Sequence, residues 1–185
     1  MFPILVKKFL YQQLYPTGNP EISFSDSHLE INGKIHVRNS AVATFRAPSD
    51  ISGVYGMRRE HIRAISSWRG GPAPGFEVAR VFLFFSFQHQ DESYPCALIQ
   101  WYSYIGTQPD DDTGLWKIKP DTEDDGNPHL AVIHLETIFR AVHLMPAYCT
   151  AEFISRTITM HSSLDIFNTF YVNRFADHHS FANLS

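Results

Sequence analysis

The chain has 185 residues, of which 44% are hydrophobic, 14% aromatic and 18% charged, and its formal net charge is −4 at pH 7. This composition excludes an intrinsically disordered chain, and the length suits one domain with short appendages. The two cysteines, Cys96 and Cys149, lie in apolar segments outside any C-x-x-C pair. We therefore expect buried free thiols rather than a disulfide framework.

The N-terminal part of the chain predicts a helix followed by a linker. Residues 2–15 place apolar side chains at near-helical spacing, with Pro3 suited to a first turn and Pro16 to the end. Residues 17–33 are polar and rich in turn formers. We expect a short amphipathic helix that either packs on the domain or continues an upstream element.

The next elements are a strand and a turn of helix. Residues 34–45 predict a strand. Residues 57–65 are interpreted as a helical turn that places Arg59 and Arg63 on one face, four residues apart. A loop rich in glycine and proline at residues 68–75 then leads into the most apolar part of the chain.

Residues 78–102 give the strongest structural signal. Two apolar arms, residues 78–87 and 94–102, are rich in aromatic and β-branched residues and are separated by a polar stretch. This pattern predicts a β-hairpin. The first arm is so uniformly apolar that we expect both of its faces to be covered.

Short elements are predicted after the hairpin. In order, they are an acidic loop (103–114), a strand (115–119), a second acidic loop (120–128), a strand (131–135), a turn of helix (136–141), an extended piece (142–148) and a helix (164–175) capped by Ser162 or Ser163. Many short strands between terminal helices predict a mainly β (α+β) fold, either a bent sheet or a small, partly open barrel. We divide the chain into an N-terminal helix and linker (1–33), a β-rich core (34–149) and a C-terminal helical extension (150–185).

The charges are unevenly distributed along the chain. Residues 34–80 hold eight Lys or Arg against three acids, whereas residues 81–185 hold five against thirteen. The best electropositive cluster consists of Arg58, Arg59, Arg63 and Arg69. Arginine binds phosphate or carboxylate in a bidentate manner, and the nearby Trp68 can stack on a base if it is exposed. The competing interpretation is an ordinary basic surface around a core tryptophan.

Aromatic residues flank the first acidic loop and suggest a peptide site. Their π faces, with a nearby carboxylate, are suited to a methylated lysine. The competing interpretation packs these aromatics, above all Trp101 and Trp116, into the core. The residues assigned to this predicted site are Tyr102, Tyr104, Trp116, Asp110, Asp111 and Asp112.

No pattern indicates catalysis, a cofactor or a metal. Residues 121–126 resemble the start of a calcium loop, but Val132 stands where the bidentate glutamate belongs. There is no H-E-x-x-H or G-x-S-x-G motif, and Cys96 lacks a basic neighbour that would activate it. Because no apolar run approaches the roughly 20 residues of a membrane span, and because no signal peptide is recognisable, we expect an intracellular protein without a membrane partner.

Several ordered blocks resemble a known family. They are residues 40–50, 56–63, 67–71, 78–81 with 84–87, 94–98, 112–116, 132–138 and 170–179. Together they resemble the C-terminal region of proteins encoded by Plavaka-type DNA transposons of mushroom-forming fungi, relatives of the Kyakuja–Dileera–Zisupton group, over about residues 8–179. The catalytic region of such transposases lies upstream, so the resemblance implies no strand-transfer activity. Residues 72–77 stand where the family usually has a longer segment, which implies a lost strand or loop and an imperfect barrel.

The order of the elements is also similar to that of a bromo-adjacent homology (BAH) domain, a β-rich module of chromatin proteins. These resemblances imply a non-enzymatic, nuclear binding module that docks on histone tails or DNA and takes no small-molecule substrate. The alternative is a structural or dimerisation domain of a transposase-related protein without a ligand of its own. An enzyme is the least favoured of the three classes because no catalytic motif supports it.

Overall fold

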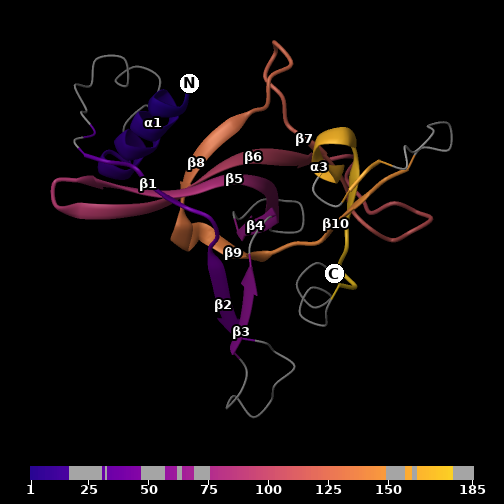
Figure 1. Ribbon diagram of the computed structural model, residues 1–185. Coiled ribbons are helices and arrows are strands. Elements are labelled where there is room, and N and C mark those ends of the chain that lie inside the picture. Colours follow the sequence, from indigo (N-terminus) through magenta and orange to yellow (C-terminus); the bar gives the residue numbers. More distant parts are fainter. Residues whose placement is uncertain are drawn as a thin grey trace.

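The computed structural model describes residues 1–16, 31, 33–46, 57–61, 64–68, 76–148, 157–159 and 162–176, with only the backbone described for residues 43–46, 57–61, 64–68 and 76. Within these ranges the protein is mainly antiparallel β, with a curled nine-stranded sheet, a separate two-stranded ribbon and two short helices (Figure 1). The predicted mainly β fold with a strongly bent sheet is therefore confirmed. Neither α1 nor any other helix in this part of the chain has the length and apolar character that a membrane crossing requires.

The elements follow one another in this order: α1 (Phe2–Leu14), β1 (His36–Arg38), β2 (Val42–Arg46), β3 (Met57–His61), β4 (Ala64–Trp68), β5 (Phe76–His89), β6 (Glu92–Tyr104), β7 (Lys117–Pro120), β8 (Leu130–His134), the 3-10 helix η1 (Leu135–Thr137), β9 (Ile138–Ala141), β10 (Leu144–Pro146), α3 (Ser163–Ile166) and β11 (Phe170–Val172). The N-terminal helix and the strands predicted near residues 117 and 131 are confirmed. The single strand predicted over residues 34–45 is divided into β1 and β2.

Two helix predictions were wrong because strand pairing overrides local pattern. Residues 57–61 form β3 and residues 64 and 65 begin β4, since β3 pairs with β2 and β4 pairs with β5. The helix predicted over residues 164–175 ends at Ile166, and Phe170–Val172 instead forms β11 between β7 and β10. Its aromatic and β-branched residues suit a buried strand as well as a helix face. The described part of the C-terminal region thus completes the main sheet.

The long hairpin of β5 and β6 is the centre of the sheet, as the sequence predicts. Its turn is tighter than the predicted polar stretch, because only Gln90 and Asp91 lie between the strands, both with positive φ (49° and 65°). Two consecutive residues with positive φ are the geometry that matches the twist of a two-residue hairpin. A register shift between Val81 and Leu83 leaves Phe82 44% exposed.

The sheet curls because one continuous segment connects its two sides. β8 pairs with β6, and β9, which follows directly after η1, pairs with β4 on the other side of the hairpin. The turn at η1 therefore bends the sheet into a half-barrel around a small apolar interior. This interior contains Ala79, Phe84, Ala97, Ile99 and Ile133.

Helix α1 covers the outer face of the hairpin. Its buried residues Val6, Phe9 and Leu10 pack with Phe85 and Phe87 of β5. The ring centroids of Phe9 and Phe87 are 6.4 Å apart in an edge-on arrangement. Because Phe84 faces the half-barrel interior while Phe85 lies in the α1 cluster, both faces of the first arm are covered, as predicted.

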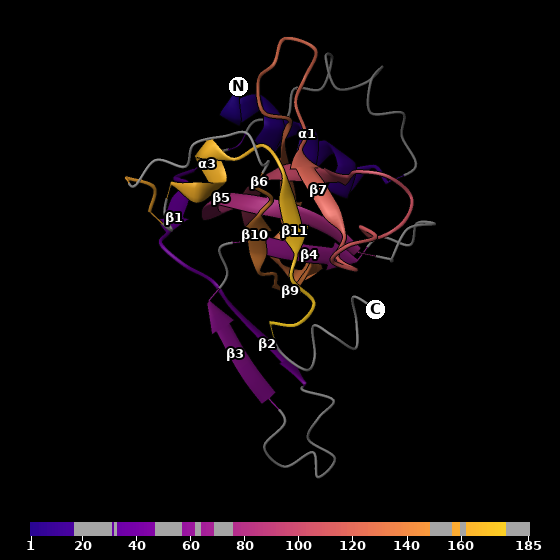
Figure 2. The ribbon, with the colours of Figure 1, turned by 90° about the vertical axis from the view of Figure 1, so that its right-hand side faces the viewer.

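A third apolar cluster joins the C-terminal strand to the hairpin. It contains Val78, Tyr102, Ile118, Phe170 and Val172. Nearby, the Arg80 guanidinium on β5 donates to the carbonyl of Leu164 (3.2 Å) and to the Asp165 carboxylate (2.6 Å), and so fastens α3 to the sheet. The ribbon of β2 and β3 extends away from this body in both views (Figures 1 and 2).

The α1–hairpin cluster makes a direct prediction about stability. Phe85 is 2% exposed and Phe82 is 44% exposed on the same strand. We expect Phe85→Ala to lower the free energy of unfolding by about 3–5 kcal/mol, since it leaves a cavity between helix and sheet. Urea unfolding followed by tryptophan fluorescence measures this, with Phe82→Ala as the matched control, for which we expect a loss below about 1.5 kcal/mol. Equal losses for the two variants would contradict the packing described.

Candidate functional site

The four arginines predicted to bind phosphate are only partly described. Arg58 lies opposite Phe45, and Arg59 opposite Thr44, in the β2–β3 ribbon. Both arginines lie in strand β3 (Met57–His61) rather than in the predicted helical turn. Arg63 and Arg69 lie outside the described residues. The structure therefore places two of the four arginines in the β2–β3 ribbon.

The predicted aromatic peptide site is divided between core and surface. Tyr102 is 4% exposed and packs edge-on against Phe170 at 5.9 Å, which removes its ring from any peptide surface. Tyr104 and Trp116 are half-buried and pack against each other, with ring centroids 5.2 Å apart. The inclusion of Tyr102 was therefore wrong, because its strand position faces the third apolar cluster.

The acidic part of that predicted site already has internal partners. The carboxylate of Asp110 bonds to Lys117 and accepts hydrogen bonds from Thr113, whose hydroxyl is 2.8 Å away. Lys117 first, and Thr113 second, lower the pKa of Asp110. The Lys117 ammonium also lies 5.3 Å from the centre of the Tyr171 ring. Asp110 is thus already paired with a cation of this chain, whereas Asp111 and Asp112 are exposed.

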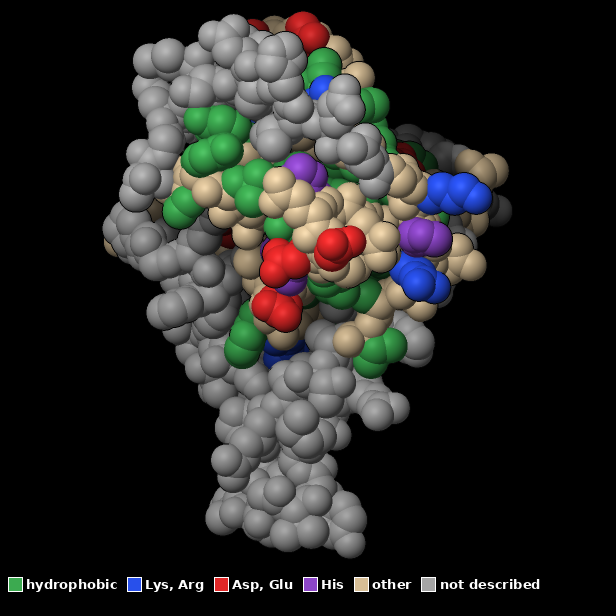
Figure 3. All heavy atoms as spheres, turned by 90° about the vertical axis from the view of Figure 1, so that its left-hand side faces the viewer, with side chains coloured by type: hydrophobic (Ala, Val, Ile, Leu, Met, Phe, Trp, Pro, Cys, Tyr) green, Lys and Arg blue, Asp and Glu red, His purple; other side chains and the backbone are tan. Residues whose placement is uncertain are grey.

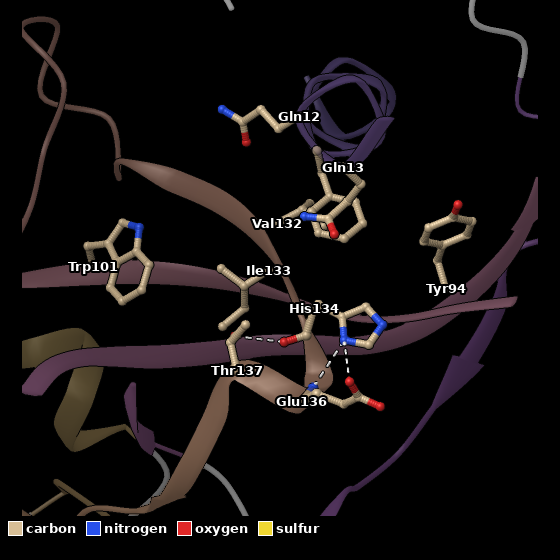
Figure 4. Close-up of a pocket in the computed structure, with 10 residues that line it drawn as sticks. Gln12, Gln13, Tyr94, Trp101, Val132, Ile133, His134, Glu136 and Thr137 are labelled. Atoms are coloured by element: carbon tan, nitrogen blue, oxygen red, sulfur yellow. Dashed lines mark hydrogen bonds and ion pairs between the residues drawn. The ribbon is translucent and has the colours of Figure 1, made fainter. Parts of the chain in front are cut away.

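A different concave site lies between α1, β6, β8 and η1 (Figure 4). This groove has a cavity volume of about 510 Å³, within the usual range for binding pockets. It is lined by Phe9, Gln12, Gln13, Tyr94, Trp101, Val132, Ile133, His134, Glu136 and Thr137. We call it the α1–β8 groove.

The α1–β8 groove is elongated. Tyr94 and Trp101 line it from the same strand, seven positions apart, which corresponds to about 23 Å of extended chain. Figure 4 shows the two rings at opposite ends of the groove, with Ile133 and His134 between them. The exposed amides of Gln12 and Gln13 form the helical wall.

Local hydrogen bonds hold the end of the groove near η1. The backbone N–H of Glu136 donates to Nδ1 of His134 (3.3 Å), and the Thr137 hydroxyl donates to the His134 carbonyl (2.7 Å). The Glu136 carboxylate lies 3.9 Å from the same histidine nitrogen, yet its side chain is 88% exposed. These bonds fix the corner where β8 ends and leave a carboxylate open to solvent.

Acidic groups gather at the Tyr94 end of the groove. His134 pairs with Cys96, two residues from Tyr94, so Glu136 lies at this end. The Tyr94 hydroxyl donates to Glu92 (3.1 Å). The pKa of Tyr94 is raised, chiefly by partial burial and secondly by the Glu92 carboxylate. Asp91 and Glu92 are exposed at the hairpin turn. Figure 3, which views the left-hand side of Figure 1, shows acidic side chains in the middle with histidines beside and above them, and basic side chains with a further histidine to one side.

The other candidates for reactive chemistry are the two cysteines and any group of metal-binding side chains. Cys96 is a buried free thiol, as predicted, and burial raises its pKa to about 12. Cys149 lies outside the described residues. Within the ranges that the structure describes, no three His, Cys, Asp or Glu side chains are grouped so that they could hold a metal ion.

Sequence reasoning missed the α1–β8 groove. Its residues come from three separate segments of the chain. The sequence marks Tyr94 and Trp101 only as parts of one arm of the predicted hairpin. Glu136 was interpreted as part of a helical turn over residues 136–141, of which only Glu136 and Thr137 lie in η1, while Ile138–Ala141 form strand β9. No local signal marks a glutamate as the acid at the end of a groove.

No protein-family model, curated protein or solved structure matches this chain. The resemblance to Plavaka-type transposon proteins and the similarity to BAH domains therefore stay proposals.

Burial of Tyr102 predicts a loss of stability at alkaline pH. Burial raises its pKa from 10.0 to about 12, so the folded state keeps a proton that the unfolded state releases. The resulting stability is complete below pH 10 and is lost as the pH rises towards 12. Tyr102→Phe should reduce this loss by about 1 kcal/mol at pH 10.5. At pH 7 the change should be neutral or slightly stabilising, because the buried hydroxyl has no recorded partner among the described residues.

Urea unfolding at pH 7 and pH 10.5 tests this, with the 53% exposed Tyr15 replaced by Phe as the control. An identical pH dependence of Tyr102→Phe and the native chain would contradict the assignment.

Proposed function

We propose that the protein is a non-enzymatic module that binds an extended, basic peptide in the α1–β8 groove. The supporting observation is the shape of the groove, which is elongated along β6 and β8. A small metabolite needs an enclosed pocket that covers most of its surface, whereas an extended chain needs length. The seven β6 positions from Tyr94 to Trp101 correspond to about 23 Å of extended chain, which accommodates roughly seven residues of a peptide strand.

The chemistry of the groove favours a peptide that combines apolar and basic side chains. Val132, Ile133 and Phe9 offer apolar contact along its floor. The exposed carboxylate of Glu136, with Glu92 and Asp91 nearby, offers charge complementarity to lysine or arginine at one end. The described residues that line the groove include no lysine or arginine to oppose this preference.

The biological setting is part of the same proposal. A lysine-rich histone tail is an extended basic peptide, and the resemblance to transposon-encoded and BAH proteins supports a nuclear, chromatin-bound role. The alternative of a purely structural or dimerising domain remains a competing proposal. It predicts that no peptide binds the groove and that the chain self-associates.

Nucleic acid is a second candidate partner, favoured by a separate observation. Lys34, His36 and Arg38 are all exposed and occupy alternate positions at and just before β1, which places them on one face of an extended chain. The adjacent β2–β3 ribbon contains Arg46, Arg58 and Arg59. Two-stranded ribbons fit the major groove of DNA, and lysine and arginine neutralise phosphates.

Charge reversal in the groove tests the peptide proposal. We expect Glu136→Lys to weaken binding of basic histone-tail peptides by about 10-fold or more, because attraction becomes repulsion. Fluorescence anisotropy with labelled H3 and H4 tail peptides, unmodified and lysine-methylated, measures the dissociation constants. Glu123→Lys is the matched control, since Glu123 is a 56% exposed acid that does not line the groove. Equal weakening by both variants would show a general charge effect and contradict the proposal.

Salt dependence tests the nucleic-acid candidate. The paired change Lys34→Gln with Arg38→Gln should weaken binding to a 20-base-pair duplex and reduce the slope of log K against log salt by about 2. Anisotropy titrations at several salt concentrations give that slope. The control pair, Lys8→Gln with Lys119→Gln, changes the net charge equally at exposed sites elsewhere. No duplex binding at low salt by the native chain would remove this candidate.

A further inference from the structure

We infer that the peptide binds by strand addition, pairing its backbone with the outer edge of β8. This inference rests on the proposed function, since it concerns the same groove. It specifies how the ligand is held: main-chain hydrogen bonds provide the affinity, and alternate side chains provide the selectivity.

The pairing of β8 leaves one of its edges facing away from the sheet. Over Leu130–His134 it pairs with β6, in register from Gln100 to Cys96. Among the described strands, β6 is the one partner of β8. A strand carries hydrogen-bonding groups on both edges, so one edge of β8 has donors and acceptors that the described sheet does not use.

The lining residues show that the groove follows this edge. Val132 and Ile133 are consecutive in β8, and their side chains belong to opposite faces of the sheet. Val132 packs in the α1 cluster, whereas Ile133 packs in the half-barrel interior. Both nevertheless line the groove. A cavity that reaches both faces of a strand must pass along its edge.

Helix α1 makes this edge a groove rather than an open surface. Phe9 and Val132 belong to one buried cluster, and this fixes the helix beside β8. The exposed Gln12 and Gln13 then form the opposite wall. A strand laid between them can bond to β8 on one side and contact the helix through its side chains.

The end of β8 sets the register of the incoming strand. The His134 carbonyl already accepts from the Thr137 hydroxyl, and the chain turns into η1. Added pairing therefore ends at His134, next to the exposed Glu136 carboxylate. This places a basic side chain of the peptide at the acidic end and commits the groove to a basic extended peptide.

Peptides with a methylated backbone test this inference. The probe is an acetylated, amidated hexapeptide of alternating lysine and valine, used unmodified, with N-methyl groups on every valine amide, or with N-methyl groups on every lysine amide. In an added strand, alternate amides face β8 and the others face solvent. We expect one methylated peptide to bind at least about 10-fold more weakly, while the other binds within about twofold of the unmodified probe.

Hydrogen exchange of the full chain provides an independent measurement. Amides of β8 that do not face β6 should gain protection when the unmodified peptide binds, and those facing β6 should change little. If the unmodified peptide binds in a Glu136-dependent manner but both methylated forms bind equally well, strand addition is overturned and the proposed function stands. If the unmodified peptide does not bind, the proposed function and the strand-addition inference are both overturned. Self-association that the peptide does not displace would assign the edge to a second copy and overturn the inference.

Discussion

Burial of both faces of β5 is the constraint on which the rest of the structure depends. Phe85 and Phe87 lie under α1, whereas Phe84 faces the half-barrel interior. A strand this apolar must be covered on both sides, so the chain needs a helix outside and a curled sheet inside. Exposing either face would cost about 1.5–3 kcal/mol for each phenylalanine. The position of α1, and with it the α1–β8 groove, follows from this requirement.

The predictability of the fold varies with the kind of signal. The hairpin and α1 were predictable because their apolar patterns are long and unambiguous. The ribbon was not, since the polar sequence of β3 lacks an apolar alternation and its strand character comes from pairing with β2. Residues 164–175 combine helix and strand signals, and the gap between β7 and β10 decides for β11. Pairing with strands that are distant in the sequence therefore determines the conformation of both segments.

The candidate site was less predictable than the fold. Aromatic and acidic residues near the first acidic loop predicted a peptide site because they are close in sequence. In the fold, however, Tyr102 faces the core and Lys117 neutralises Asp110. The groove instead combines α1, the two ends of β6 and the corner after β8. Only the curling of the sheet brings these segments together, so composition and spacing could not reveal it.

Helix α1 has buried core residues in its middle and exposed groove residues in its last turn. This difference affects how the binding specificity of the groove can change during evolution. Val6, Phe9 and Leu10 are committed to the core, so substitutions there are removed by loss of folding. Gln12 and Gln13 are exposed on the groove wall, where substitutions have little effect on folding. Under the proposed function, the same helix can therefore acquire new ligand preferences at its last turn without loss of stability. Such a scaffold can diversify its partners through two positions while its fold remains unchanged.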